Sequence, residues 1–201
     1  PGPGANRIRT TLRLRLRENG GLAAVPAVVS QAGVTEENER WKERVAALEG
    51  GTAALAVASG HAAEFLVFHT LLQPGDEFIA AKKLYGGSIN QFNHSYKNFG
   101  WNVAWANADD PSSFEAAITP KTKWFLLNNP SNPTGTWNTA EEIRRLHEAL
   151  PAHIILVIDE AYAEYVGEPD WETALPLARD AANVVVTRTF SKIHGLGGLR
   201  I

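Results

Sequence analysis

The chain has 201 residues, of which 44% are hydrophobic and 20% are charged, and its formal net charge at pH 7 is −3. This composition is typical of a globular domain with a sizeable core, and the small negative charge argues against nucleic acid as the main partner. Because cysteine is absent, a disulfide framework and cysteine metal sites are excluded. No apolar run is long enough for a membrane span and no signal peptide opens the chain, so a cytoplasmic location is expected.

Residues 1–34 differ in pattern from the rest and are expected to form an N-terminal arm of unassigned role. Leucine and arginine alternate over residues 12–17, a period of two that is typical of a half-exposed strand. The arginines could bind an anionic partner. The favoured interpretation is a solvated edge strand, whose charges discourage pairing with other chains.

From residue 35 the pattern predicts a helix to residue 49, ended by Gly50 and Gly51, and then alternating strands and helices. Strands are predicted at 53–58, 77–81, 102–106, 124–128, 154–159 and 183–188, with another beginning at Leu199. Helices are predicted at 61–73, 87–98, 112–118, 139–149 and 172–181, the fourth with a capping box of Thr139 and Glu142. This alternation predicts a three-layer αβα fold around a mainly parallel sheet of roughly seven strands.

Polar residues follow most of these strands, and in an open α/β sheet ligands bind beyond the carboxyl ends of the strands. The candidates, in chain order, are Ser59, Gly60, His61, Tyr85, Asn132, Asp159 and Tyr162. The first three open a helix, where free backbone N–H groups can hold an anion. Each candidate alone has an ordinary explanation as a turn or cap residue. Their arrival at one sheet edge predicts a common site.

The segment 187–200 contains Lys192, the only lysine after Lys123. Three hydroxyl side chains and one guanidinium accompany this amine: Thr187, Thr189, Ser191 and Arg200. A lysine amine can form a Schiff base with a carbonyl cofactor, and hydroxyl and guanidinium groups can hold a phosphate. Pyridoxal 5′-phosphate (PLP) has both groups, so the segment predicts a PLP site.

These residues resemble the fold type I PLP-dependent enzymes, the aspartate aminotransferase superfamily, over about residues 40–201. Residues 42–123, with Ala-Ser-Gly-His-Ala-Ala-Glu and Lys-Leu-Tyr-Gly-Gly-Ser, are similar to O-acetylhomoserine sulfhydrylases of Cys/Met metabolism. Residues 124–137 are similar to class I aspartate aminotransferases, and residues 153–201 to histidinol-phosphate aminotransferases. One hypothesis is that the sequence is composite, either a chimera, a designed recombinant or an imperfect reading of a natural enzyme.

The resemblance implies roles for the candidate residues. Lys192 would be the Schiff-base lysine and proton shuttle, and Asp159 would pair with the pyridinium nitrogen. Asn132 and Tyr162 would hydrogen-bond the ring hydroxyl oxygen, and Tyr85 would stack on the ring. The phosphate would be held by Ser59, Gly60, His61, Thr189 and Arg200, with Ser191 as a weaker candidate. Lys192, Asp159 and Tyr162 form the predicted catalytic set.

Residues 35–201 would then be the PLP-binding large domain of a homodimeric enzyme, without the C-terminal small domain that closes the site in this superfamily. The favoured function is transamination between an amino acid or amino-alcohol phosphate and a 2-oxo acid. The alternatives are γ-replacement on an O-acylated homoserine and a scaffold without activity. Nucleotide binding is disfavoured because no Gly-x-Gly-x-x-Gly follows a strand, and metal binding because the six histidines lack ligand spacing.

Overall fold

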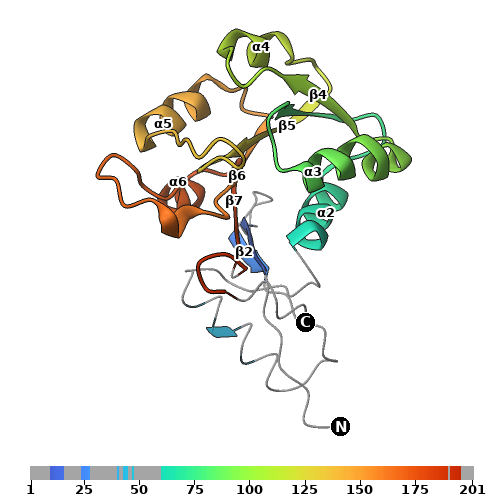
Figure 1. The fold of residues 1–201 in the computed structure, drawn as a ribbon. Coiled ribbons are helices and arrows are strands. Elements are labelled where there is room, and N and C mark those ends of the chain that lie inside the picture. Colours follow the sequence, from blue (N-terminus) through green and yellow to red (C-terminus); the bar gives the residue numbers. More distant parts are fainter. Residues whose placement is uncertain are drawn as a thin grey trace. The chain divides into compact units, whose positions relative to one another are not determined.

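The computed structural model describes residues 10–15, 24–27, 40, 43–44, 47, 60–189 and 191–195 (Figure 1). The chain divides into two compact units. The first unit comprises residues 1–67 and 175–201, and the second unit comprises residues 68–174. Among the described residues no helix has the length and apolar character needed to cross a membrane.

The second unit contains four parallel strands in the order β6-β5-β3-β4. The strands are β3 (Glu77–Ala81), β4 (Asn102–Ala106), β5 (Thr122–Asn128) and β6 (Ile155–Asp159). The chain passes from β3 to β4 on one side and then returns to β5 on the other side of β3. The order of the strands therefore reverses between β3 and β5, and the carboxyl ends of the strands at such a point are where α/β sheets bind ligands.

Helical segments connect these strands, as the alternating pattern predicted. Their bounds are α3 (Gly86–Asn90), the π-helical turn η1 (Gln91–Ser95), the 3-10 turn η2 (Tyr96–Phe99), α4 (Pro111–Ala116), α5 (Ala140–Ala149) and the 3-10 turn η3 (Ala163–Tyr165). The single helix predicted over 87–98 is thus three consecutive helical segments. Helix α2 (Gly60–Leu71) precedes β3 and crosses the boundary between the units.

One face of the second unit's sheet is covered by an aromatic cluster. Phe78 of β3 and Trp124 of β5 are partners in the strand register and therefore share this face. The ring of Phe68, from the end of α2, lies 4.7 Å from that of Phe78 and 4.4 Å from that of Trp124. Phe92 of η1 lies 5.0 Å from Phe78. This dry cluster packs α2 and the α3–η2 segment on the sheet.

The opposite face carries Phe125, the residue after Trp124, because successive strand residues alternate between faces. Phe114 of α4 stacks on it with ring centroids 5.2 Å apart. Helices therefore cover both faces of the parallel sheet, as the predicted αβα architecture requires. Figure 1 shows the ribbons of α3 and α4 on different sides of β5.

The first unit contains β1 (Thr10–Arg15), β2 (Ala24–Ala27), β7 (Val184–Thr189) and helix α6 (Leu175–Asp180). Strand β1 pairs antiparallel with both β2 and β7, so the prediction of an edge strand here is wrong. The Leu/Arg alternation correctly indicates a strand but carries no information on its number of neighbours. The terminal strand is β2, and its Pro26 suits that position because proline lacks the N–H that an internal strand donates.

The other predicted elements of the described region are confirmed. The strands predicted from 77 to 188 and the helices at 61–73, 112–118 and 139–149 agree within about two residues, the usual uncertainty of element ends. The last helix begins at Leu175 rather than residue 172. The strands predicted at 53–58 and from Leu199, and most of the helix over 35–49, lie outside the described residues. The α/β class with mainly parallel strands is confirmed.

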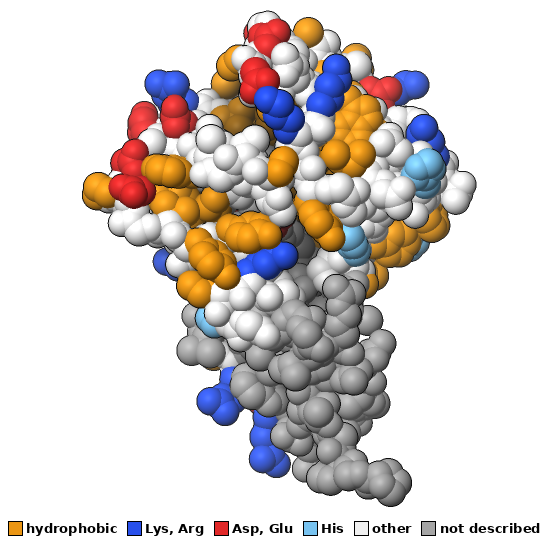
Figure 2. Space-filling view, in the orientation of Figure 1, with side chains coloured by type: hydrophobic (Ala, Val, Ile, Leu, Met, Phe, Trp, Pro, Cys, Tyr) orange, Lys and Arg blue, Asp and Glu red, His pale blue; other side chains and the backbone are white. Residues whose placement is uncertain are grey.

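The surface of the second unit mixes both signs of charge, in line with the small net charge. Figure 2 shows acidic and basic side chains next to one another on this face. Two ion pairs illustrate this: Lys83 with Asp109 at 2.6 Å and Arg144 with Glu141 at 3.2 Å. All four side chains are largely exposed, so these pairs contribute little to stability.

Candidate active site

The predicted site residue Asp159 is the last residue of β6 and lies opposite Asn128, the last residue of β5. Because the strands are parallel and in register, they end together. Asn128 Nδ2 donates a hydrogen bond to Asp159 Oδ2 at 3.1 Å. The backbone N–H of Ala161 donates to Asp159 Oδ1 at 3.2 Å. The carboxylate is therefore held at both oxygens.

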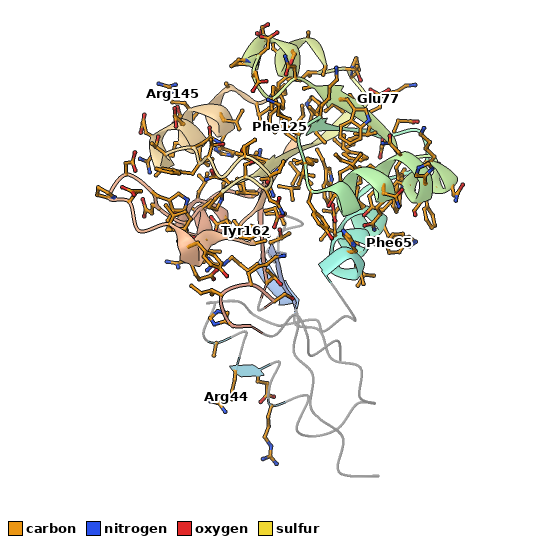
Figure 3. All side chains as sticks on the ribbon, in the orientation of Figure 1. Arg44, Phe65, Glu77, Phe125, Arg145 and Tyr162 are labelled. Carbon is orange, nitrogen blue, oxygen red and sulfur yellow. The ribbon has the colours of Figure 1, made fainter. Side chains whose placement is uncertain are left out.

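The same asparagine holds a second predicted residue. Asn128 Oδ1 accepts a hydrogen bond from the backbone N–H of Asn132 at 3.0 Å. The side-chain Nδ2 of Asn132 in turn donates to the hydroxyl oxygen of Tyr162 at 3.2 Å. A continuous chain of hydrogen bonds thus links Asp159, Asn128, Asn132 and Tyr162 beyond the ends of β5 and β6 (Tyr162 is labelled in Figure 3).

The loop that carries Asn132 is closed by its own hydrogen bonds. Asn129 is buried, its Nδ2 donates to the carbonyl of Asn138 at 3.2 Å, and its Oδ1 accepts from the N–H of Asn138 at 2.7 Å. Within the loop Gly135 has φ +70° and donates to the carbonyl of Ser131 at 2.9 Å. The peptide bonds before Pro130 and Pro133 are cis. These contacts fold the segment into a turn, which is the ordinary explanation that the sequence allows for its prolines and glycine.

Glu160 follows Asp159 directly and is fully buried. Its carboxylate accepts hydrogen bonds from the hydroxyl of Thr173 at 2.7 Å and from the backbone N–H of Ala174. Burying a carboxylate is costly unless such donors are present. The pair of contacts therefore attaches the chain between Asp159 and Tyr162 to a segment more than ten residues away. The sequence patterns did not single out either Glu160 or Asn128.

Tyr85 follows β3, the neighbour of β5, and stands at the start of α3. Its side chain is 51% exposed. It lies beyond the same carboxyl edge of the parallel sheet as Asp159, since β3, β5 and β6 run in one direction. An aromatic ring at this edge can pack against a planar ligand.

The remaining predicted residues belong to the first unit or lie outside the described residues. Gly60 and His61 are the first residues of α2, and His61 is half-buried. Thr189 ends β7, and its hydroxyl accepts a hydrogen bond from the N–H of Ser191 at 3.1 Å. Lys192 is half-buried, and its carbonyl accepts from the N–H of Gly195 at 2.9 Å. Ser59 and Arg200 lie outside the described residues.

The chemistry of these groups fits PLP. A carboxylate fixed by two donors can accept the N–H of a pyridinium ring, and an amide next to a phenol can bind a ring oxygen. In the part of the chain that the structure describes, no group of three or more histidine, aspartate or glutamate side chains could hold a metal ion.

Comparisons with known proteins agree with this fit. The family of Cys/Met metabolism PLP-dependent enzymes matches residues 34–180. Histidinol-phosphate aminotransferase 1 of Caulobacter vibrioides is 57% identical over 84 residues, which are 42% of this chain and 23% of that protein. The histidinol-phosphate aminotransferase of Rhodopseudomonas palustris (strain BisB18) is 44% identical over 138 residues, 68% of this chain and 37% of that protein. The chain thus spans well under half the length of these relatives.

Two solved structures are similar in fold. A putative O-acetylhomoserine (thiol)-lyase from Campylobacter jejuni, solved with N′-pyridoxyl-lysine-5′-monophosphate, has 28% identity and a TM-score of 0.58, and the match covers 77% of this chain and 36% of that one. A putative histidinol-phosphate aminotransferase from Erwinia carotovora atroseptica has a TM-score of 0.65 at 24% identity, covering 83% and 51%. Two of the three groups that the sequence resembles, the histidinol-phosphate aminotransferases and the enzymes that act on O-acetylhomoserine, are thus found among its relatives. The chain belongs to the family of Cys/Met metabolism PLP-dependent enzymes, of fold type I, whose cofactor is pyridoxal 5′-phosphate.

Proposed function

We propose that this chain carries PLP on Lys192 and acts in transamination of an amino acid or amino-alcohol phosphate. The observation that supports this most directly is the hydrogen-bond chain from Asp159 through Asn128 and Asn132 to Tyr162. It sets the Asp159 carboxylate and the Tyr162 phenol beyond the end of β6, and the Asn132 amide beyond the end of neighbouring β5, where the ring of PLP requires an acceptor and donors.

Each residue has a distinct task in this proposal. Asp159 accepts the N–H of the ring nitrogen and keeps the proton there, while Asn132 and Tyr162 bind the ring hydroxyl oxygen. When bound, PLP supplies an electron sink for the bonds at the substrate α-carbon. The Lys192 amine moves a proton at that carbon, and Tyr85 packs on the ring. The phosphate is bound by backbone and side-chain donors: Ser59, Gly60, His61, Thr189, Ser191 and Arg200.

Reduction with borohydride tests the attachment of PLP. The chain is incubated with PLP, reduced, digested and analysed by mass spectrometry, and we expect the pyridoxyl group on Lys192. The other six lysines provide internal controls. Half-exposed Lys83, for example, should stay unmodified at stoichiometric PLP. A label spread over surface lysines, or one that persists in a Lys192→Ala variant, contradicts the proposal.

The relatives support two candidate reactions. The curated relatives quoted above are named histidinol-phosphate aminotransferases, which favours transamination of an amino-alcohol phosphate. The family match over residues 34–180 and the thiol-lyase structure favour γ-replacement on O-acetylhomoserine as the second candidate.

An activity comparison separates these reactions. The PLP-loaded chain is given histidinol phosphate with 2-oxoglutarate, or O-acetylhomoserine with sulfide, and the Lys192→Ala variant is the control for each. Glutamate formed in the first assay only supports the aminotransferase, and homocysteine in the second only supports γ-replacement. A yellow protein that is inactive in both is a scaffold. We further propose a cytoplasmic homodimer, and light scattering of the purified chain tests its oligomeric state.

A further inference from the structure

We propose that Asn128 is a positioning residue. This inference rests on the proposed function. Its side chain fixes the Asp159 carboxylate and the Asn132 backbone relative to one another. Each end of its side-chain amide hydrogen-bonds one of these partners. The catalytic and cofactor-binding candidates named above do not include it.

The two contacts define which way the amide points. The backbone N–H of Asn132 can only donate, so the atom that it approaches at 3.0 Å is the carbonyl oxygen of Asn128. The amide nitrogen therefore faces Asp159 Oδ2 at 3.1 Å. A side chain at this position must donate at one end and accept at the other. Aspartate is of equal length but can only accept when ionised, and an aliphatic residue can do neither.

The consequence is that one side chain controls both ends of the predicted ring site. Its donor end restricts rotation of the Asp159 carboxylate, whose other oxygen is held by the N–H of Ala161. Its acceptor end holds the backbone of Asn132, whose side chain reaches the hydroxyl of Tyr162. Positions of ring-binding groups must be maintained closely, since small displacements reduce binding and catalysis strongly.

The next residue offers a matched control. Asn129 is also an asparagine with both ends of its amide occupied, but its partners are the backbone N–H and carbonyl of Asn138 in the loop. The same substitution at both positions removes one donor and keeps one acceptor. The difference is that at position 128 the introduced carboxylate faces Asp159, whereas at position 129 it faces a carbonyl oxygen.

The experiment compares Asn128→Asp with Asn129→Asp in the full chain. PLP binding is titrated by absorbance, the visible spectrum of the bound cofactor is recorded, and thermal unfolding without PLP measures folding. We expect Asn128→Asp to weaken PLP binding about tenfold or more, from the loss of a charge-assisted hydrogen bond and the added like charge. We also expect a changed visible spectrum, because the ring nitrogen has a displaced partner. Asn129→Asp should lower thermal stability but bind PLP within about twofold of wild type, since its side chain contacts the backbone of Asn138 and not the Asp159 carboxylate.

Two outcomes overturn the inference about Asn128 but leave the proposed function intact. One is wild-type affinity and spectrum in Asn128→Asp. The other is equal loss of PLP binding in both variants together with equal loss of thermal stability, which indicates a general role of the loop in folding. If Asn128→Asp does not fold, Asn128→Ser is used instead, because its neutral hydroxyl is too short to reach both partners, and the same reduction in binding is expected. Failure of the wild-type chain to bind PLP, or unchanged binding in Asp159→Asn, contradicts the proposed function itself.

Discussion

At the scale of single residues, the buried carboxylate of Glu160 is as well satisfied as that of Asp159 but has a different use. Its donors, the hydroxyl of Thr173 and the N–H of Ala174, are structural and leave it no access to a ligand, since the residue is fully buried. Under the proposed function, two adjacent acidic residues thus have different roles, because successive residues at the end of the strand point in different directions. Their identity alone does not distinguish them.

The contribution of the Glu160 contacts to the free energy of unfolding can be measured. Glu160→Ala removes the acceptor that the half-buried hydroxyl of Thr173 and the buried N–H of Ala174 share, and we expect it to reduce the free energy of unfolding by about 3 kcal/mol. Urea denaturation followed by tryptophan fluorescence measures the change. Glu168→Ala, on the exposed loop nearby, should change stability by less than about 0.5 kcal/mol. Equal effects of the two substitutions would show that the Glu160 contacts are not stabilising.

At the scale of elements, the start of helix α5 is determined by two side chains at its own N-terminus. Thr139 accepts a hydrogen bond from the N–H of Glu142, and Glu142 accepts one from the N–H of Thr139 at 2.8 Å, which completes the predicted capping box. These backbone and hydroxyl donors of Thr139 lower the pKa of Glu142 below its ordinary value of 4.5, with a smaller contribution from Arg145. The charged form of this carboxylate is therefore favoured by folding.

The lowered pKa of Glu142 determines how its contribution to folding stability changes with pH. Because the folded-state pKa is lowered, the stabilisation by Glu142 is fully present above pH 4.5 and is lost as the pH falls through the folded value. The stability difference between wild type and Glu142→Gln should be constant near pH 7 and should shrink below pH 4.5. Urea titrations at several pH values test this. Exposed Glu141→Gln is the control, and a difference that grows in acid would contradict the cap.

The turn before β4 is specified by a glycine. Gly100 has φ +75°, and a Cβ there would lie 3.1 Å from Cβ of Pro74. We expect Gly100→Ala to destabilise the chain by about 1–2 kcal/mol through backbone strain and this close contact. In Gly167→Ala, where a Cβ would meet nothing within 4 Å, the effect should be below about 0.5 kcal/mol. Thermal unfolding distinguishes the two, and similar midpoints would contradict the steric argument.

At the scale of the whole molecule, cofactor binding and folding are coupled. A ligand that binds only the native state adds about 2.7 kcal/mol of stability at a hundredfold excess over its dissociation constant. For a chain of this size we expect the midpoint of thermal unfolding to rise by roughly 5–10 °C with PLP. The Lys192→Ala variant should show a much smaller rise, because the covalent link is lost. Scanning calorimetry with and without PLP measures both, and an equal rise in the two proteins would contradict attachment at Lys192.

Local patterns were sufficient to predict most elements and to name the candidate site residues. The strands from 77 to 189 follow from short apolar runs, the capping box from Thr139 and Glu142, and the loop at Asn132 from its prolines and glycine. Asp159 and Tyr162 could be named as candidates because one ends a buried strand and the other follows it closely. Such features depend on interactions within a few residues, which the order of amino acids expresses directly.

Tertiary structure decided the contacts between residues distant in the chain. The Asn128–Asp159 contact joins residues 31 positions apart, and it exists because β5 and β6 end in register. The two neighbours of β1 and the donors to Glu160 are likewise non-local. Periodicity in a sequence reports which face of a strand is apolar, whereas the choice of partner depends on the packing of the complete sheet. The amino-acid order by itself therefore determined the elements and the chemical groups, and folding decided which of those groups meet.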